Sequence, residues 1–230
     1  MARLSLGRRI STAARWPVGV TLTSWRYMWR TTPMARREVQ LEPGAAEPPP
    51  LPEDFNLDGV QTHEDGVGTL FHRRYRIRIA EPDCSAADVI ADLHDDLDAF
   101  APSELARFLR VSGNGRCAAG DEYVVRMPGP WDGPVRVVDV SDASIRLATL
   151  DGHLEAGQIE FRAADDNGEL VFTIESWARS STRLTDFLYD RARMSKEVQV
   201  HMWVSFLERV RDRARGRRSG PIDIETRRIG

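Results

Sequence analysis

Alternating hydrophobic and polar residues predict a β-strand at residues 71–79. In this stretch Phe71, Tyr75 and Ile77 are separated by His72 and by arginines. A period of two is typical of a strand with one face on a hydrophobic core and the other in water. We therefore expect this strand to have one hydrophobic face and one wet, arginine-lined face.

Further short segments have the composition of strands and are separated by turn sequences rich in Asp, Gly and Pro. Turn signals about eight to twelve residues apart are typical of antiparallel strands. The pattern predicts a meander and not a doubly wound parallel sheet. We expect its strands at residues 123–127, 135–140, 145–150, 158–164 and 170–178, and a final edge strand around Ile222 and Ile224.

Hydrophobic residues spaced three and four apart predict helices on both sides of the meander. Asp83 or Ser85 is placed to cap a short helix that carries Leu93 on its apolar face. Pro102 is placed to start a second helical turn, with Phe108 behind it. A long C-terminal helix is expected at residues 182–215, with an apolar stripe formed by Leu184, Leu188, Met194, Val198, Met202, Phe206 and Val210.

The order of these elements predicts the fold. A strand and two small helices come first, followed by five or six antiparallel strands and one long C-terminal helix. A curved antiparallel sheet wrapped around that helix would bury the apolar stripe, which is the helix-grip arrangement of the α+β class. Such a fold leaves a cavity between sheet and helix, and cavities of this kind are natural ligand sites.

The net charge of −3 conceals an uneven distribution. Residues 1–40 hold eight Arg and one Glu, a net +7, and residues 41–206 hold sixteen basic and thirty acidic residues, a net −14. Residues 207–230 hold eight Arg and four acids, a net +4. The nearly neutral whole argues against a dedicated nucleic-acid partner. The basic ends suit either pairing with the acidic body or a phosphate surface, and lipid suits them better than nucleic acid because of the nearby tryptophans.

A proline-rich stretch separates the first basic segment from the body. Five prolines between residues 42 and 53 favour an extended segment with little core. We therefore divide the chain into a basic N-terminal arm (1–40), a Pro-rich linker (41–66), a helix-grip domain (67–218) and a C-terminal tail (219–230).

The spacing of hydrophobic residues predicts a short amphipathic helix at residues 18–29 of the basic arm, with Trp16, Trp25 and Trp29 close together in the sequence. The interpretation that we favour is a helix that docks on the domain through its aromatic face. The alternative is peripheral contact with a membrane, because Trp and Arg suit the headgroup region. The apolar run is too short to cross a membrane, which takes about twenty residues.

The remaining motifs point away from cofactor and metal chemistry. Cys84 and Cys117 lie in no Cys-x-x-Cys motif or Cys/His cluster, so the sequence predicts neither redox nor zinc chemistry. Reduced thiols are the simpler interpretation and indicate a cytoplasmic protein. The chain has no Walker loop, Gly-x-Ser-x-Gly elbow or His-Glu-x-x-His motif. We expect no cofactor and no bound metal.

His153 and Glu155 are the strongest candidates for chemistry. Two residues apart on an extended chain, they face the same way and suit an acid–base pair or two metal ligands. No third ligand occurs at a telling spacing. Gly152 and Gly157 bracket them, so a hairpin loop with polar tips is the interpretation that we favour.

Aromatic residues with a polar group can line a cavity and orient a ligand, although each also suits ordinary packing between sheet and helix. Taken together with the His153 pair, they form our predicted set of ligand-binding residues. The set consists of Tyr123, Trp131, His153, Glu155, Trp177, Arg179, Tyr189 and Trp203.

Several short motifs resemble an uncharacterised domain family of unknown function. They are Gly152-His-Leu-Glu-Ala-Gly157, Ile159-Glu-Phe161, Phe172-Thr-Ile-Glu-Ser-Trp-Ala-Arg179, Leu188-Tyr-Asp190 and Met202-Trp203, with Thr23–Arg30, Gly120–Tyr123 and Trp131–Pro134 also matching. The resemblance covers about residues 18–215. This family is grouped with the START-like, polyketide-cyclase-like (SRPBCC) helix-grip superfamily. The resemblance implies a hydrophobic-ligand cavity. It carries over no catalytic residue, because the superfamily has no common ones.

The leading functional hypothesis is a helix-grip protein that binds a small hydrophobic or amphipathic ligand without catalysis. A second hypothesis is an enzyme that uses His153 and Glu155 at the mouth of the cavity. A third is an adaptor that contacts a membrane surface or a partner through residues 1–40.

Overall fold

The computed structural model describes residues 32–230 except residues 43, 45, 128–131 and 183–192. Within the last helix, side chains are described from Gln199 onward. The expected amphipathic helix at residues 18–29, with Trp16, Trp25 and Trp29, lies outside the described residues. So does the first part of the expected long helix.

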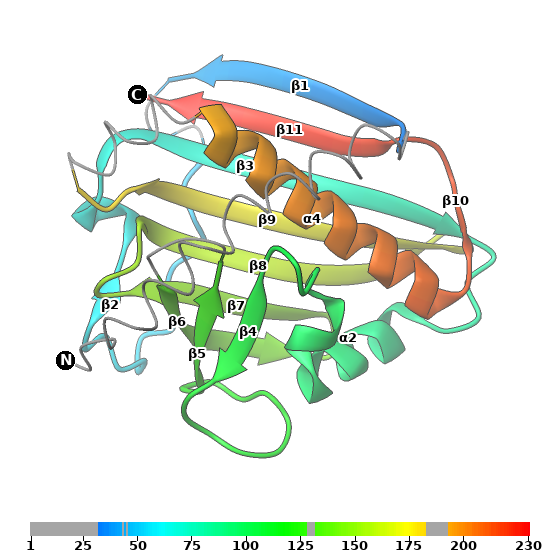
Figure 1. The fold of residues 1–230 in the computed structure, drawn as a ribbon, viewed down its shortest axis with the longest axis horizontal. Helices are drawn as coiled ribbons and strands as arrows, with labels where there is room; N and C mark the ends of the chain where they lie inside the picture. The colour runs from blue at the N-terminus through cyan, green and yellow to red at the C-terminus, as the bar shows by residue number, and fades with distance from the viewer. Residues whose placement is uncertain (1–31, 43, 45, 128–131, 183–192) are drawn as a thin grey trace.

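In the described parts of the chain, eleven strands form one large sheet (Figure 1). Its strand order is β1-β11-β3-β9-β8-β7-β6-β5-β4, while β10 pairs with β3 and β2 pairs with β7. All pairings are antiparallel except that of β1 with β11, which is parallel. The strands are β1 (Met34–Leu41), β2 (Val60–Gln61), β3 (Val67–Ala80), β4 (Arg107–Arg110), β5 (Glu122–Arg126), β6 (Asp132–Ser141), β7 (Ser144–Leu150), β8 (Glu155–Asp166), β9 (Glu169–Ser180), β10 (Arg217–Arg218) and β11 (Ile222–Ile229).

Among the described residues, two α-helices and two short 3-10 helices accompany the sheet. The α-helices are α2 (Ala86–Asp95) and α4 (Arg193–Ala214), and the 3-10 helices are η1 (His63–Asp65) and η2 (Leu97–Phe100). Figure 1 shows α4 lying across one face of the curved sheet, with α2 near the C-terminal end of α4. The predicted α+β helix-grip architecture, including the antiparallel meander from β4 to β9, is confirmed.

The hydrophobic core lies between α4 and the sheet. Met202, Phe206 and Val210 are buried on α4, as their spacing predicts. Phe206 packs against three aromatic rings of the sheet and η2, with centroid distances of 5.2 Å to Phe161, 5.8 Å to Phe100 and 6.1 Å to Phe172. The helix is therefore held by an aromatic cluster at the centre of the sheet.

Ser85, and not Asp83, caps helix α2. Its hydroxyl accepts a hydrogen bond from the backbone N–H of Asp88, and the Asp88 carboxylate accepts one from the backbone N–H of Ser85 at 2.9 Å. This reciprocal pair satisfies donors that have no partner within the helix. The cap fixes the start of α2, whose apolar face with Leu93 is buried.

The face of the sheet away from α4 carries the arginines that the alternation predicts, and each has an acidic partner. On β3, Arg76 pairs with Asp223 at 3.0 Å, and Arg78 pairs with Asp166 at 2.9 Å. These pairs are about one-third exposed or more, so each contributes little to stability. Their main consequence is that the arginine-lined face is electrically balanced.

The structure corrects the second predicted helix. Phe108 lies in strand β4, which pairs with β5 in antiparallel register. Asp98 fixes the start of this strand, because its carboxylate accepts a hydrogen bond from the Phe108 backbone N–H and pairs with Arg107 at 2.7 Å. A single turn does begin at Pro102, whose carbonyl oxygen accepts hydrogen bonds from the backbone N–H groups of Leu105 and Ala106, and strand pairing ends it before Phe108.

The sheet extends beyond the predicted domain limits of residues 67 and 218. Residues 34–41, which the charge pattern assigns mainly to the arm, form the edge strand β1. Strand β11, predicted as an edge strand, lies inside the sheet between β1 and β3. Strand β1 pairs with β11 over the full length of both strands, so residues 34–41 and the last residues of the chain form one edge of the sheet.

The Pro-rich segment also contacts the body of the protein. The carbonyl oxygen of Pro49 accepts a hydrogen bond from Gln158 Nε2 at 3.2 Å, and that of Pro50 accepts one from Arg146 Nη1 at 3.1 Å. Proline has no backbone N–H donor but keeps its carbonyl acceptor, so a Pro-rich segment can accept hydrogen bonds of this kind. The segment therefore runs along the face of the sheet away from α4.

Candidate ligand pocket

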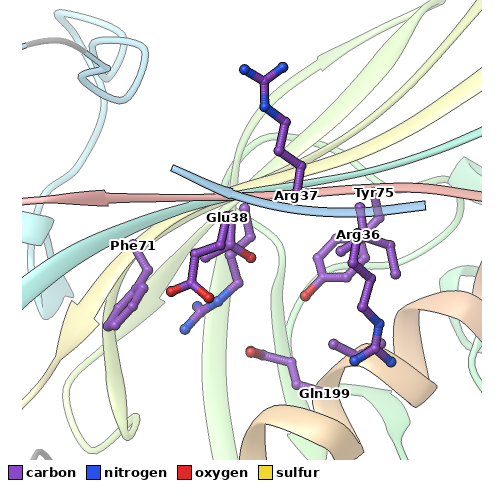
Figure 2. A pocket seen from close by; sticks show the side chains of 10 residues that line it. Arg36, Arg37, Glu38, Phe71, Tyr75 and Gln199 are labelled. Atoms are coloured by element: carbon purple, nitrogen blue, oxygen red, sulfur yellow. The ribbon is translucent and has the colours of Figure 1, made fainter. Parts of the chain in front are cut away.

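A pocket of about 260 Å³ lies between strands β1, β11 and β3 and the described N-terminal part of α4 (Figure 2). It combines charged, amide and hydroxyl groups with aromatic and aliphatic ones. Its lining consists of Arg36, Arg37, Glu38, Phe71, Arg73, Tyr75, Gln199, Val200, Ile224 and Thr226.

The register of three strands brings these residues together. Arg36 lies opposite Ile224, which lies opposite Tyr75 on β3. Two positions farther along β1, Glu38 lies in the same way beside Thr226 and Arg73. Residues opposite one another in a ladder project from the same face of a sheet. Figure 2 shows Arg36, Glu38 and Tyr75 on the side of α4, whereas Arg37 extends from the other side of β1.

Arg73 is the charged residue set deepest in the pocket wall. Its side chain is only 7% exposed, and its Nη1 atom lies 3.6 Å from a carboxylate oxygen of Glu155. The guanidinium carbon lies 4.6 Å from the centre of the Phe71 ring, within range of a cation–π interaction. Gln199 Nε2 donates to both Glu155 oxygens at 3.5 Å. Sheet and helix are thus linked by a polar group of residues beside the pocket.

Glu155 is the predicted site residue that comes nearest to this pocket. The structure does not join it to His153 as an acid–base pair of side chains. His153 Nδ1 instead accepts a hydrogen bond from the Glu155 backbone N–H at 2.9 Å. Burial lowers the pKa of His153 against the raising effect of the Glu155 charge, so the imidazole is neutral near pH 7.

His153 packs against a glycine of the neighbouring strand. A Cβ atom at Gly133 would lie 2.7 Å from His153 Nε2. The ring is therefore held in the hairpin between β7 and β8 by its own backbone contact on one side and by β6 on the other. This arrangement supports the interpretation of residues 152–157 as a structured hairpin.

The other predicted residues do not line the pocket. Trp177 and Arg179 project from the face of β9 away from α4, where Trp177 stacks on His72 with ring centres 4.9 Å apart. Trp203 is buried in the core on α4, edge-on to Phe161. Trp131 and Tyr189 lie outside the described residues.

Tyr123 faces the core at the far side of the sheet from the pocket. Its hydroxyl accepts hydrogen bonds from Arg110 Nε at 2.9 Å and Nη2 at 2.6 Å, and it is also hydrogen-bonded to the Cys117 thiol. Burial raises the pKa of Tyr123 to about 12 from its ordinary value of 10.0, although Arg110 acts in the opposite direction. The cluster holds β4 and β5 together through a neutral phenol.

This raised pKa predicts the alkaline titration of the protein. The wild type and a Tyr123→Phe variant are titrated with alkali while the phenolate absorbance is recorded. The difference between the two titration curves reports Tyr123 alone and should have its midpoint near pH 12. Because the folded pKa is the higher one, the stability contributed by Tyr123 is complete below pH 10 and is lost as the pH rises through about 12. A difference titration centred near pH 10 would contradict the buried environment.

Sequence reasoning missed the residues that form the pocket, above all Arg73. One signal was present in the alternation itself. Arg73 occupies an inward position of β3, between Phe71 and Tyr75, where the pattern calls for a hydrophobic residue. A buried charge at such a position needs a partner and is a candidate functional group.

The described residues show neither a metal-binding cluster nor a membrane-spanning helix. They contain no group of three or more His, Cys, Asp or Glu side chains placed to hold a metal ion. Within the same residues, no helix is both long enough and apolar enough to span a bilayer.

Comparison with known proteins identifies a family. The family model described as "Domain of unknown function (DUF1990)" matches residues 58–208. No curated protein matches the chain.

Similar solved structures include three proteins of low identity. Norcoclaurine synthase of Thalictrum flavum is 11% identical, with 64% of this chain and 98% of that chain covered at a TM-score of 0.43. Major latex-like protein 151 of Panax ginseng is 14% identical, with 64% and 99% covered at 0.45. A hypothetical protein of Helicobacter pylori is 10% identical, with 61% and 86% covered at 0.45.

Proposed function

The chain belongs to the DUF1990 family, whose description names no activity, and from the geometry of the pocket we propose that it binds a small amphipathic ligand between β1, β11, β3 and α4. The observation that carries the proposal is a pocket that combines charged and apolar side chains in the space between the sheet and the helix. Sites for small molecules are typically apolar clefts with a few placed polar groups.

This mixed lining suits the polar and apolar parts of an amphipathic molecule. Phe71, Tyr75 and Ile224 offer aromatic and aliphatic surface from the sheet, and Val200 does so from the helix. Arg73 and Gln199 place polar groups at the same pocket. A volume of about 260 Å³ lies just below the range of about 300–1,000 Å³ that is common for drug-sized ligands. The proposed ligand is therefore small, with one polar end.

The proposal includes binding and no catalytic step. His153 is engaged with the backbone of its own hairpin, and Glu155 is engaged with Arg73 and Gln199. Neither arrangement supplies an acid–base pair directed at a common substrate atom, which general acid–base catalysis requires.

Filling the pocket should weaken binding. In a Val200→Trp variant the indole would fill part of the pocket. We therefore expect octan-1-ol, octanoate and octylamine all to lose at least about tenfold in affinity relative to the wild type, measured by isothermal titration calorimetry on the full chain. Val111 is 59% exposed and away from the pocket lining, so Val111→Trp is the matched control and should bind as the wild type does.

Native mass spectrometry of the purified full chain provides a second measurement. A small molecule that co-purifies with the wild type and with Val111→Trp, but not with Val200→Trp, would support the proposal. If none of the three octyl compounds binds and no small molecule co-purifies, or if Val200→Trp binds as well as the wild type, the proposal is wrong.

A further inference from the structure

We propose that the ligand carries an oxyanion, a carboxylate or a phosphate, and that the guanidinium of Arg73 binds it. This inference rests on the proposed function and adds the chemical class of the ligand. It starts from the state of Arg73 in the pocket wall.

The guanidinium of Arg73 is buried without a hydrogen bond. Its side chain is 7% exposed, yet none of its N–H groups donates a hydrogen bond to any residue that the structure describes. The nearest carboxylate oxygen, on Glu155, is 3.6 Å away, beyond the usual range for an N–H···O bond. The printed contacts of the guanidinium are this long ion pair and the Phe71 ring, so donor capacity remains for a ligand in the pocket. A ligand oxygen in the pocket would supply the missing acceptors.

Phe71 fixes the orientation of this group. The guanidinium carbon of Arg73 lies 4.6 Å from the centre of the Phe71 ring, and that of Arg228 lies 5.7 Å from the same ring. A guanidinium held over a ring keeps its N–H groups free along its edge. Such an edge matches the two oxygens of a carboxylate or phosphate, which accept two parallel hydrogen bonds.

The charges around the pocket leave a positive excess. Among the described residues that line it or contact its lining, the cations on this face are Arg36, Arg73 and Arg228, and the anions are Glu38 and Glu155. Glu38 is 3.8 Å from Arg228, and Glu155 is 3.6 Å from Arg73. An anionic ligand would bring its charge to a group of described side chains in which cations outnumber anions.

Glu155 would compete with the ligand for Arg73. Its carboxylate is the counter-charge of the guanidinium and is held in place by the Gln199 amide. A ligand oxyanion at Arg73 would therefore feel repulsion from Glu155 at close range. Removing that charge while keeping the shape, in Glu155→Gln, should strengthen binding of an anion and leave binding of a neutral molecule unchanged.

The experiment compares three ligands that differ only in the polar end. Octanoate, octyl phosphate and octan-1-ol are titrated by calorimetry into the full chain. We expect the two anions to bind about 10- to 100-fold more tightly than the alcohol, the range for hydrogen bonds to charged groups. Arg73→Met should bring both anions to the level of the alcohol. The tighter of the two anions identifies the preferred oxyanion, and either result supports the proposal.

Two further variants separate recognition from folding. Arg76 lies on the same strand but on the opposite face, paired with Asp223, so Arg76→Met is the matched control and should keep the preference for anions. Arg73→Lys keeps the charge without the paired donors and should lose part of that preference. Glu155→Gln should tighten the binding of the anions several-fold, an effect that a damaged fold would not produce.

Equal affinities for the anions and the alcohol in the wild type would overturn this inference, as would an undiminished preference for anions in a folded Arg73→Met protein. In both cases the proposed function survives if octan-1-ol binding remains sensitive to Val200→Trp. If none of the octyl compounds binds, the proposed function and this inference fail together.

Discussion

Replacing Phe206 with alanine is expected to lower the free energy of unfolding by about 3–5 kcal/mol, the usual cost of removing a buried phenylalanine. Phe206 is fully buried, and its ring packs against Phe161, Phe172 and Phe100. These partners come from β8, β9 and η2. The variant would therefore leave a cavity where the helix meets the centre of the sheet.

Urea denaturation followed by circular dichroism measures this loss. The control is Leu57→Ala, because Leu57 is 55% exposed and exposed substitutions usually change stability by less than about 0.5 kcal/mol. A loss below about 1 kcal/mol for Phe206→Ala would mean that α4 is not anchored at this point. The helix-grip core would then lie elsewhere.

Replacing Gly157 with alanine is expected to cost about 2–6 kcal/mol, from overpacking and backbone strain together. Gly157 lies within β8, opposite Ala178 of β9. A Cβ atom there would be 1.9 Å from the carbonyl oxygen of Trp177. Because the obstacle is backbone, no side-chain rotation relieves it. The strand would have to move away from β9.

Gly168→Ala is the matched control for this prediction. Gly168 also has a positive φ, but its added Cβ would meet nothing within 4 Å. It should therefore lose only the backbone preference of glycine, about 1–2 kcal/mol. Thermal or urea unfolding of both variants tests the difference. Equal losses would show that the close approach of β8 and β9 at Gly157 does not constrain the sheet.

The strong Gly157 requirement also bears on the pocket. Glu155 lies two residues before Gly157 on the same strand, and its backbone N–H is bonded to His153. Displacing β8 would carry Glu155 away from Arg73 and Gln199. We therefore regard the hairpin of residues 152–157 as the element that sets the polar side of the pocket.

Much of the fold was predictable because it follows from local patterns. The alternation in β3 and in the strands from β5 to β9 has a period of two, and the stripe with Met202, Phe206 and Val210 has the period of a helix. These periods reflect which side chains must be buried together. The turn predicted at Pro102 forms, but the pairing of β4 with β5 ends it before Phe108.

The pocket could not be predicted in the same way, because its residues come from four separated segments. Arg36, Arg73, Gln199 and Thr226 become neighbours only when β1 pairs with β11 and α4 crosses the sheet. The charge pattern separated residues 1–40 from the body of the protein. The last of these residues nevertheless belong to β1, which forms one edge of the sheet and of the pocket. Trp177 illustrates the reverse case, since its aromatic character suggested a ligand site while the register places it on the other face.

The sequence by itself determined the elements, the helix-grip class and the balance of an acidic body with basic ends, since each depends on composition and periodicity over short stretches. Only the tertiary structure decided which charges face one another and which remain without a hydrogen bond. That decision depends on strand order and register, which shift a side chain from one face to the other with a step of one residue. Arg73 is the clearest example: the sequence places a charge in a hydrophobic stripe, and the register of β1, β11 and β3 places that charge in a pocket.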